Sequence, residues 1–174
     1  MTSDKVIKIK FPCIELLPSF FDYAKALSAN GDSIWDSYYP NEGESDEAFI
    51  QRQLDRATIP EPPLVRETVY WGVIGDTVVG RVSLRHELNE NLREMGGHIG
   101  YEVHPGFRGQ GVATKMLEEI LKIPKAREIG KILLTCNPDN IGSNKTILNN
   151  GGVLEKKAFV KRVDGFRNYY WITL

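Results

Sequence analysis

The segment that carries the clearest chemistry is residues 98–113, HIGYEVHPGFRGQGVA. It predicts a strand, a proline-containing turn and then the glycine-bearing entry of a helix. Backbone N–H groups in the first turn of a helix have no partner within the helix and lie at the positive end of its dipole, so they can bind anions. Gly109 and Gly111 would let an anion approach the backbone closely. The turn therefore predicts a site for a phosphate or pyrophosphate group.

Two common nucleotide-binding motifs do not fit this turn. Gly106 and Gly111 have the glycine spacing of a P-loop, but Val and Ala follow where that motif requires Lys and Ser or Thr to bind phosphate and magnesium. Gly109 and Gly111 also open a dinucleotide fingerprint, but Thr114 stands in the place of its third glycine. The expected ligand is therefore a phosphate ester of another kind.

Several side chains on or beside the predicted strands could exchange a proton with a ligand. His98 and Glu102 share one face of the predicted strand because side chains alternate along it. Histidine titrates near neutral pH, which makes His98 the first candidate for a general base, followed by Glu102 and Glu87. His98 as a buried structural residue is the alternative, as are carboxylates that bind a cationic ligand or face solvent. The candidates are His86, Glu87, His98 and Glu102.

The elements around this segment predict an α/β fold. Alternating and β-branched residues indicate strands at residues 6–11, 68–74, 78–84, 98–103, 131–136, 154–163 and 166–174. Apolar residues at helical spacing indicate helices at residues 18–28, from residue 46 to the proline run that begins at residue 60, at 109–128 and at 142–150. Ser45 is the expected N-cap of the second helix. Pro124 is expected to kink the third helix rather than end it.

The composition limits the class of protein. A chain of 174 residues that is 41% hydrophobic is long enough for one compact domain, expected over residues 1–174. Its 22 basic and 23 acidic residues give a net charge of −1, so we expect no nucleic-acid partner. No run approaches the roughly 18 apolar residues of a membrane span, and no secretory leader is evident. We therefore expect a cytoplasmic protein with no membrane partner.

The cysteines do not predict a metal site. Cys13 and Cys136 are far apart and lack His or Cys neighbours at metal-ligand spacing. We expect both to be reduced, and Cys136 to be a core thiol rather than a nucleophile.

The strand, turn and helix resemble the GNAT superfamily of acyl-CoA-dependent N-acyltransferases. The family motif Gln/Arg-x-x-Gly-x-Gly/Ala is matched by Arg108, Gly111 and Ala113. The flanking strands and the next helix entry extend the resemblance over most of the chain, most strongly over residues 68–152. It implies a single-domain GNAT-like α/β fold, with a mixed, mostly antiparallel sheet of about six to seven strands, about four flanking helices and splayed central strands.

The resemblance also implies the ligand and its site. Acetyl-CoA is the implied co-substrate, with no metal, and its acetyl group passes to a primary amine by direct attack. Backbone N–H groups of residues 108–113 would bind the pyrophosphate, and the backbone of Val103 would pair with the pantetheine arm. The implied cofactor residues are Val103, Arg108, Gly109, Gln110, Gly111, Val112, Ala113, Thr114, Asn140 and Ser143.

One family feature is missing. Many GNAT enzymes carry a tyrosine four residues before the glycine that ends the last helix, as the acid for the departing thiolate, and this chain has Ile147 there. Tyr101, Tyr169, Tyr170 or solvent would have to substitute. The departure leaves a non-catalytic acyl-CoA sensor as an alternative function.

The acceptor is the least determined part of the resemblance. Acidic residues in the expected ligand-facing loops favour a small cationic amine, and acetylation of a protein amine is the alternative. The oligomeric state stays open, with a homodimer included. These acidic residues are Asp36, Glu42, Glu44 and Glu87.

Overall fold

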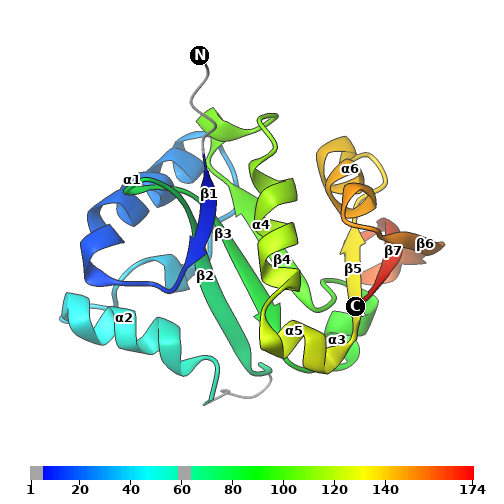
Figure 1. Cartoon of the computed structure of the whole chain (residues 1–174), viewed down its shortest axis with the longest axis horizontal. Coiled ribbons are helices and arrows are strands. Elements are labelled where there is room, and N and C mark those ends of the chain that lie inside the picture. The colour runs from blue at the N-terminus through cyan, green and yellow to red at the C-terminus, as the bar shows by residue number, and fades with distance from the viewer. Residues whose placement is uncertain (1–5, 59–63) are drawn as a thin grey trace.

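The computed structural model describes residues 6–58 and 64–174, which form seven strands and six α-helices (Figure 1). The strands are β1 (Ile7–Lys10), β2 (Glu67–Ile74), β3 (Thr77–Arg85), β4 (Ile99–Val103), β5 (Lys131–Cys136), β6 (Val153–Val160) and β7 (Gly165–Thr173). The helices are α1 (Leu17–Ala29), α2 (Asp46–Asp55), α3 (Glu90–Glu94), α4 (Val112–Leu121), α5 (Pro124–Ile129) and α6 (Ile141–Asn149). No helix of these described residues is long and apolar enough to span a membrane.

The strands form two antiparallel sheets that separate at the centre of the molecule. One sheet has the order β1-β2-β3-β4 and the other the order β5-β7-β6. They join where Gly97 bridges Leu134 and the His98 N–H donates to the carbonyl of Leu133 at 2.8 Å. No ladder continues between β4 and β5 beyond this point. The predicted splayed centre is therefore present, as a break between two sheets rather than within one mixed sheet.

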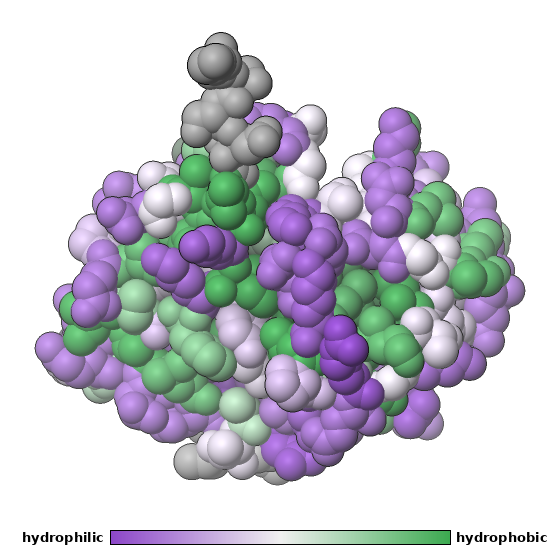
Figure 2. Space-filling view, viewed as in Figure 1, coloured by the Kyte–Doolittle hydropathy of each residue, from purple (hydrophilic) through white to green (hydrophobic). Residues whose placement is uncertain are grey.

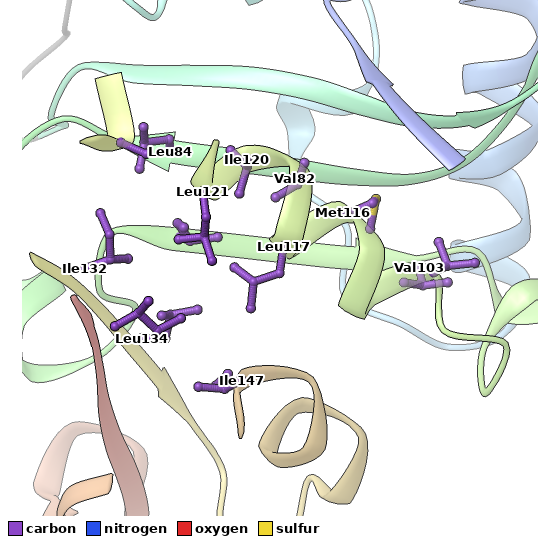
Figure 3. Close-up of a cluster of buried hydrophobic side chains, with 14 of the residues drawn as sticks. Val82, Leu84, Val103, Met116, Leu117, Ile120, Leu121, Ile132, Leu134 and Ile147 are labelled. Atoms are coloured by element: carbon purple, nitrogen blue, oxygen red, sulfur yellow. The ribbon is translucent and has the colours of Figure 1, made fainter. Parts of the chain in front are cut away.

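Helix α4 packs across the front of the four-stranded sheet (Figure 1), and its apolar side chains belong to one buried cluster with Ile132 and Leu134 of β5. Its side chains Met116, Leu117 and Ile120 are fully buried, and Figure 3 shows them among residues of β3, β4 and β5. Burial of each such side chain contributes roughly 1.5–3 kcal/mol, so this helix holds the two sheets together. The other face of the first sheet is covered by α1 and α2 through a second apolar cluster.

Two paired glycines let α4 come close to the sheet. Gly72 in β2 pairs with Gly80 in β3. A Cβ atom on Gly72 would lie 2.3 Å from the Met116 sulfur, and one on Gly80 would lie 2.7 Å from the Glu102 carbonyl oxygen. Larger residues at these positions would push α4 away, and with it the glycine turn that precedes the helix.

Most predicted elements are present within a few residues of their expected bounds, but one prediction is wrong. Pro124 does not kink one long helix, because Ile123 is extended (ψ 149°) and Pro124 begins the separate helix α5. The segment between β3 and β4, to which the sequence assigns no helix or strand, contains α3, capped by the Asn89 side chain. Ser45 caps α2 as expected, and the proline run that begins at residue 60 lies outside the described residues.

Candidate active site

A cavity of about 590 Å³ opens where β4 and β5 diverge, between the entries of α4 and α6. Figure 2 shows the surface hollowed between these two parts of the molecule. Nine of the ten predicted cofactor residues line it, namely Val103, Arg108, Gly109, Gly111, Val112, Ala113, Thr114, Asn140 and Ser143. The remaining lining residues are Asp32, Tyr101, Glu102, Phe107, Gly142, Lys145, Thr146 and Asn149.

The entry of α4 suits an anionic ligand. Gly111 is its N-cap in the left-handed conformation (φ 79°) and supplies no side-chain cap, whereas α2 and α6 are capped by Ser45 and Asn140. Gly109 is also left-handed (φ 70°), and no atom lies within 4 Å of a Cβ built on either glycine. The first-turn N–H groups of α4 therefore meet no side-chain cap at the wall of the cavity, which is the geometry that binds a phosphate.

Arg108 connects the two sides of the cavity. Its Nη2 lies 2.8 Å from Oδ2 of Asp32, and its Nε donates to the Val103 carbonyl at 3.0 Å. The hydrogen bond from Arg108 holds the pKa of the Asp32 carboxyl below its usual value. Gln110 is the predicted cofactor residue that does not line the cavity, because its side chain donates to the Gly106 carbonyl at 2.9 Å.

Glu102 is the proposed base that the structure brings to the cavity. The hydroxyls of Tyr38 and Tyr23 both donate to its Oε2, the latter at 3.4 Å. Oε1 makes no hydrogen bond to any residue in the described part of the chain. Burial raises the pKa of both tyrosines, so both remain protonated donors. The arrangement fixes the carboxylate through one oxygen and leaves the other for a ligand.

The other two proposed bases lie elsewhere. His98 does not line the cavity: it is buried where the two sheets meet, and its Nδ1 accepts a hydrogen bond from the Leu133 N–H at 2.9 Å. Burial, together with Arg93 and Arg85, lowers the pKa of His98 to about 4, so its ring is neutral at pH 7. Glu87 is ion-paired with Arg66 at 2.7 Å, outside the cavity lining.

A pair of hydroxyls joins β4 to α6 at the cavity. The Tyr101 hydroxyl lies 2.9 Å from Oγ of Ser143, and both residues line the cavity. Burial raises the pKa of Tyr101 to about 12, although the Ser143 hydrogen bond opposes the shift. Ile147, where many relatives carry tyrosine, is 1% exposed and lies within the core cluster that Figure 3 shows. Burial raises the pKa of Cys136 to about 11, which suits a core thiol.

Tyr23, Tyr38 and Asp32 are site residues that the sequence did not single out. Tyr38 lies in the aromatic and acidic stretch of residues 33–45, which is predicted to be a loop able to face a ligand, and this stretch was the one available signal. Its partner Glu102 is 64 positions away in the chain, and no local pattern links the two.

The splayed sheets and the uncapped glycine entry of α4 define an α/β domain built to bind a phosphate ester at its centre. The model of the Acetyltransferase (GNAT) family matches residues 30–148, which is more than half of the chain. The chain belongs to the GNAT acetyltransferase family.

Solved structures of similar fold are acetyltransferases. The microcin C7 self-immunity acetyltransferase MccE, in complex with acetyl-CoA and AMP, is 19% identical (TM-score 0.68, covering 99% of this chain and 94% of that one). RimL, the ribosomal L7/L12 alpha-N-protein acetyltransferase, is 17% identical (0.63, covering 98% and 92%). YncA, a putative acetyltransferase from Salmonella typhimurium with acetyl-CoA, is 14% identical (0.59, covering 97% and 94%). No curated protein matches the sequence. The described residues hold no group of three or more His, Cys, Asp or Glu suited to a metal ion.

Proposed function

We propose that this protein transfers an acetyl group from acetyl-CoA to a primary amine by direct attack of the amine on the thioester. The observation that carries the proposal is that the uncapped entry of α4 and Glu102 line the same cavity. Oε1 of Glu102 makes no hydrogen bond within the described residues. One end of the cavity suits a pyrophosphate and the other holds a proton acceptor, as the two halves of this reaction require.

The donor half of the site rests on residues 108–114. The N–H groups at the entry of α4 would bind the pyrophosphate, and Arg108 would add a charge-assisted hydrogen bond. The Val103 carbonyl would accept from an amide of the pantetheine arm once Arg108 releases it. Asn140 and Ser143 line the cavity at the start of α6, where they would contact this arm.

The acceptor half rests on Glu102. An amine with a pKa near 10.4 is neutral in only about one molecule in a few thousand at pH 7, and only the neutral form attacks. As the N–C bond forms, the nitrogen becomes acidic and Oε1 of Glu102 accepts its proton, directly or through water. Tyr38 and Tyr23 hold Oε2, so the carboxylate keeps one orientation during the transfer.

The leaving group is the CoA thiolate, which departs when the C–S bond of the tetrahedral intermediate breaks. The Tyr101 and Ser143 hydroxyls can stabilise it by hydrogen bonds. Transfer of a full proton from a phenol with a pKa of about 12 to an ordinary thiolate is uphill, because thiols have pKa values near 8.5. Water is therefore the final proton source, and the missing family tyrosine does not prevent turnover.

The acidic residues of the loops no longer serve as the basis for predicting the charge of the acceptor. Two of the four acidic residues that favoured a small cationic amine are ion-paired, Glu44 with Arg52 and Glu87 with Arg66, each at 2.7 Å. Their charges are therefore largely neutralised. Solved structures of similar fold include a ribosomal-protein acetyltransferase, so protein amines stay in the set of acceptors to test.

The test is steady-state release of CoA against a panel of small amines and peptides, paired with calorimetric binding of acetyl-CoA. We expect binding, and CoA release that depends on at least one amine. Binding without release across the panel would favour an acyl-CoA sensor instead. Failure to bind acetyl-CoA would overturn both functions.

A further inference from the structure

A cluster of arginines lies on the same face of the first sheet as Glu102. Arg81 is directly opposite Glu102 in the β3–β4 register, and Arg85 is four residues further along β3 on that face because side chains alternate. Arg56, at the end of α2, reaches the cluster from the helical layer. We call Arg56, Arg81 and Arg85 the arginine cluster.

One buried carboxylate serves two of these arginines. Oε2 of Glu67 lies 2.5 Å from Nη2 of Arg56, and Oε1 lies 3.9 Å from Nη2 of Arg81. Burial alone would raise the pKa of Glu67, but the charges of Arg81 and Arg56 outweigh it and hold the pKa at about 2. Glu67 is therefore ionised at neutral pH. Three guanidinium groups face two carboxylates if Glu102 is included, so this face keeps an excess of one positive charge.

Glu67 is also the direct partner of Arg85 in the β2–β3 register, but no ion pair joins the two. Nη1 of Arg85 donates to the carbonyls of Gly96 and Gly97 at 3.3 and 3.1 Å, which ties down the loop before β4. No carboxylate of the described residues lies within ion-pair distance of Arg85. Burial lowers the pKa of Arg85; Glu67 opposes this shift, and Arg81 and Arg56 add to it. A guanidinium that is largely removed from water and shares one carboxylate with two other arginines would be stabilised by an anionic ligand.

The free part of Arg85 lies beside the proposed base. Its Nη2 is 3.3 Å from the position that a Cβ of Gly100 would occupy. Gly100 is half-buried and precedes Glu102 by two residues on the same face, a spacing of roughly 7 Å along a strand. Because Gly100 has no side chain, the guanidinium group lies directly over the strand, with Nη1 and Cζ 3.7 and 3.8 Å from the same position. An oxyanion at Nη2 would accept from the guanidinium N–H groups that the carbonyls of Gly96 and Gly97 do not use.

We propose that Arg85 binds an anionic group of the acceptor, a carboxylate or a phosphate, while the acceptor amine lies at Glu102. This inference rests on the proposed function and names its substrate class: an amine that carries a negative charge within roughly 7 Å of its nitrogen. Amino acids, aminoalkyl phosphates and acidic peptides belong to this class, whereas polyamines do not.

The experiment compares acceptors that differ only in the anionic group. β-Alanine is paired with its amide and phosphoethanolamine with ethanolamine, so the two arms separate a carboxylate from a phosphate. kcat/KM is measured at saturating acetyl-CoA for the wild type, Arg85→Gln and Arg85→Lys. Arg66→Gln serves as the control, because Arg66 is exposed and paired with Glu87, whereas Arg85 makes no ion pair and lies over Gly100 on the strand that carries Glu102.

We expect the wild type to prefer the anionic member of at least one pair. Arg85→Gln should lower kcat/KM for that member about 10- to 100-fold and leave its neutral partner within about twofold, with partial rescue by lysine. An equal loss for both members would mean that Arg85 only holds the loop, and a wild-type preference for neutral amines would also overturn the proposal.

The proposed acetyltransferase activity and the anion site at Arg85 can be tested separately. If no amine is acetylated, binding of the same four compounds is measured by calorimetry in the wild type and in Arg85→Gln. Binding of an anionic member that is lost in Arg85→Gln would support the anion site without the activity. Absence of any such difference would overturn the anion site.

Discussion

Replacing Gly111 by aspartate adds a carboxylate at the entry of α4, where we place the pyrophosphate. At roughly 5 Å from a phosphate charge, Coulomb repulsion is about 1–3 kcal/mol for an effective dielectric constant between bulk water and a protein surface. This repulsion corresponds to roughly a 5- to 150-fold weaker affinity for acetyl-CoA. The left-handed backbone (φ 79°) adds up to about 2 kcal/mol of strain, but no atom within 4 Å obstructs the new side chain.

Asparagine at the same position isolates the charge, because it has nearly the same shape and tolerates the left-handed region as aspartate does. Gly75→Asp, at an exposed left-handed position in the β2–β3 turn, controls for backbone strain far from the cavity lining. Isothermal titration calorimetry with acetyl-CoA gives the affinity, and the melting temperature checks the fold. Equal affinities for the aspartate and asparagine variants, or an aspartate variant that binds like the wild type, would refute the placement of the pyrophosphate.

The structure also predicts the effects of changes at Asp32, His98 and Gly97. Asp32→Asn should tighten acetyl-CoA binding about two- to fivefold by freeing Arg108, and calorimetry showing weaker binding would contradict this. The pKa of His98 is depressed to about 4 in the folded protein. Its contribution to the free energy of unfolding is therefore full above pH 6.5 and is lost on acidification toward pH 4, by up to about 3 kcal/mol. Urea titrations across this pH range should show a smaller loss of stability in His98→Asn. Gly97→Ala should lower the melting temperature by roughly 6–12 °C, since its Cβ would lie 2.3 Å from a backbone carbonyl, whereas Gly75→Ala should cost far less.

The sequence predicts the elements well where the signals are local. The glycine turn before α4, the Ser45 cap and the hairpin of β2 and β3 each depend on residues within a few positions of one another. Pro124 was misread because the same residue can kink a helix or begin one, and the extended conformation of Ile123 decides between them. The residues where we place the cofactor line one cavity, and the sequence could group them because most of them follow one another along the chain.

The choice of Glu102 as the proposed proton acceptor could not be made from the sequence in the same way. His98 and Glu102 share a strand, and alternation alone does not separate them. Their environments differ because His98 lies where β4 meets β5, whereas Glu102 lies where the strands have parted and two tyrosines from the helical layer reach it. The environments of both residues depend on contacts between residues distant in sequence, which the sequence of one chain does not reveal.

The most direct test of the central claim is amine-dependent CoA release by the wild type and by Glu102→Gln, together with the acetyl-CoA affinity of each. The glutamine can still accept hydrogen bonds from both tyrosines but cannot take a proton, so kcat should fall about 10²- to 10⁴-fold while the affinity stays within about twofold. Full activity of Glu102→Gln would contradict the assignment of the base. A wild type that binds acetyl-CoA but releases no CoA with any amine would contradict the proposed reaction itself.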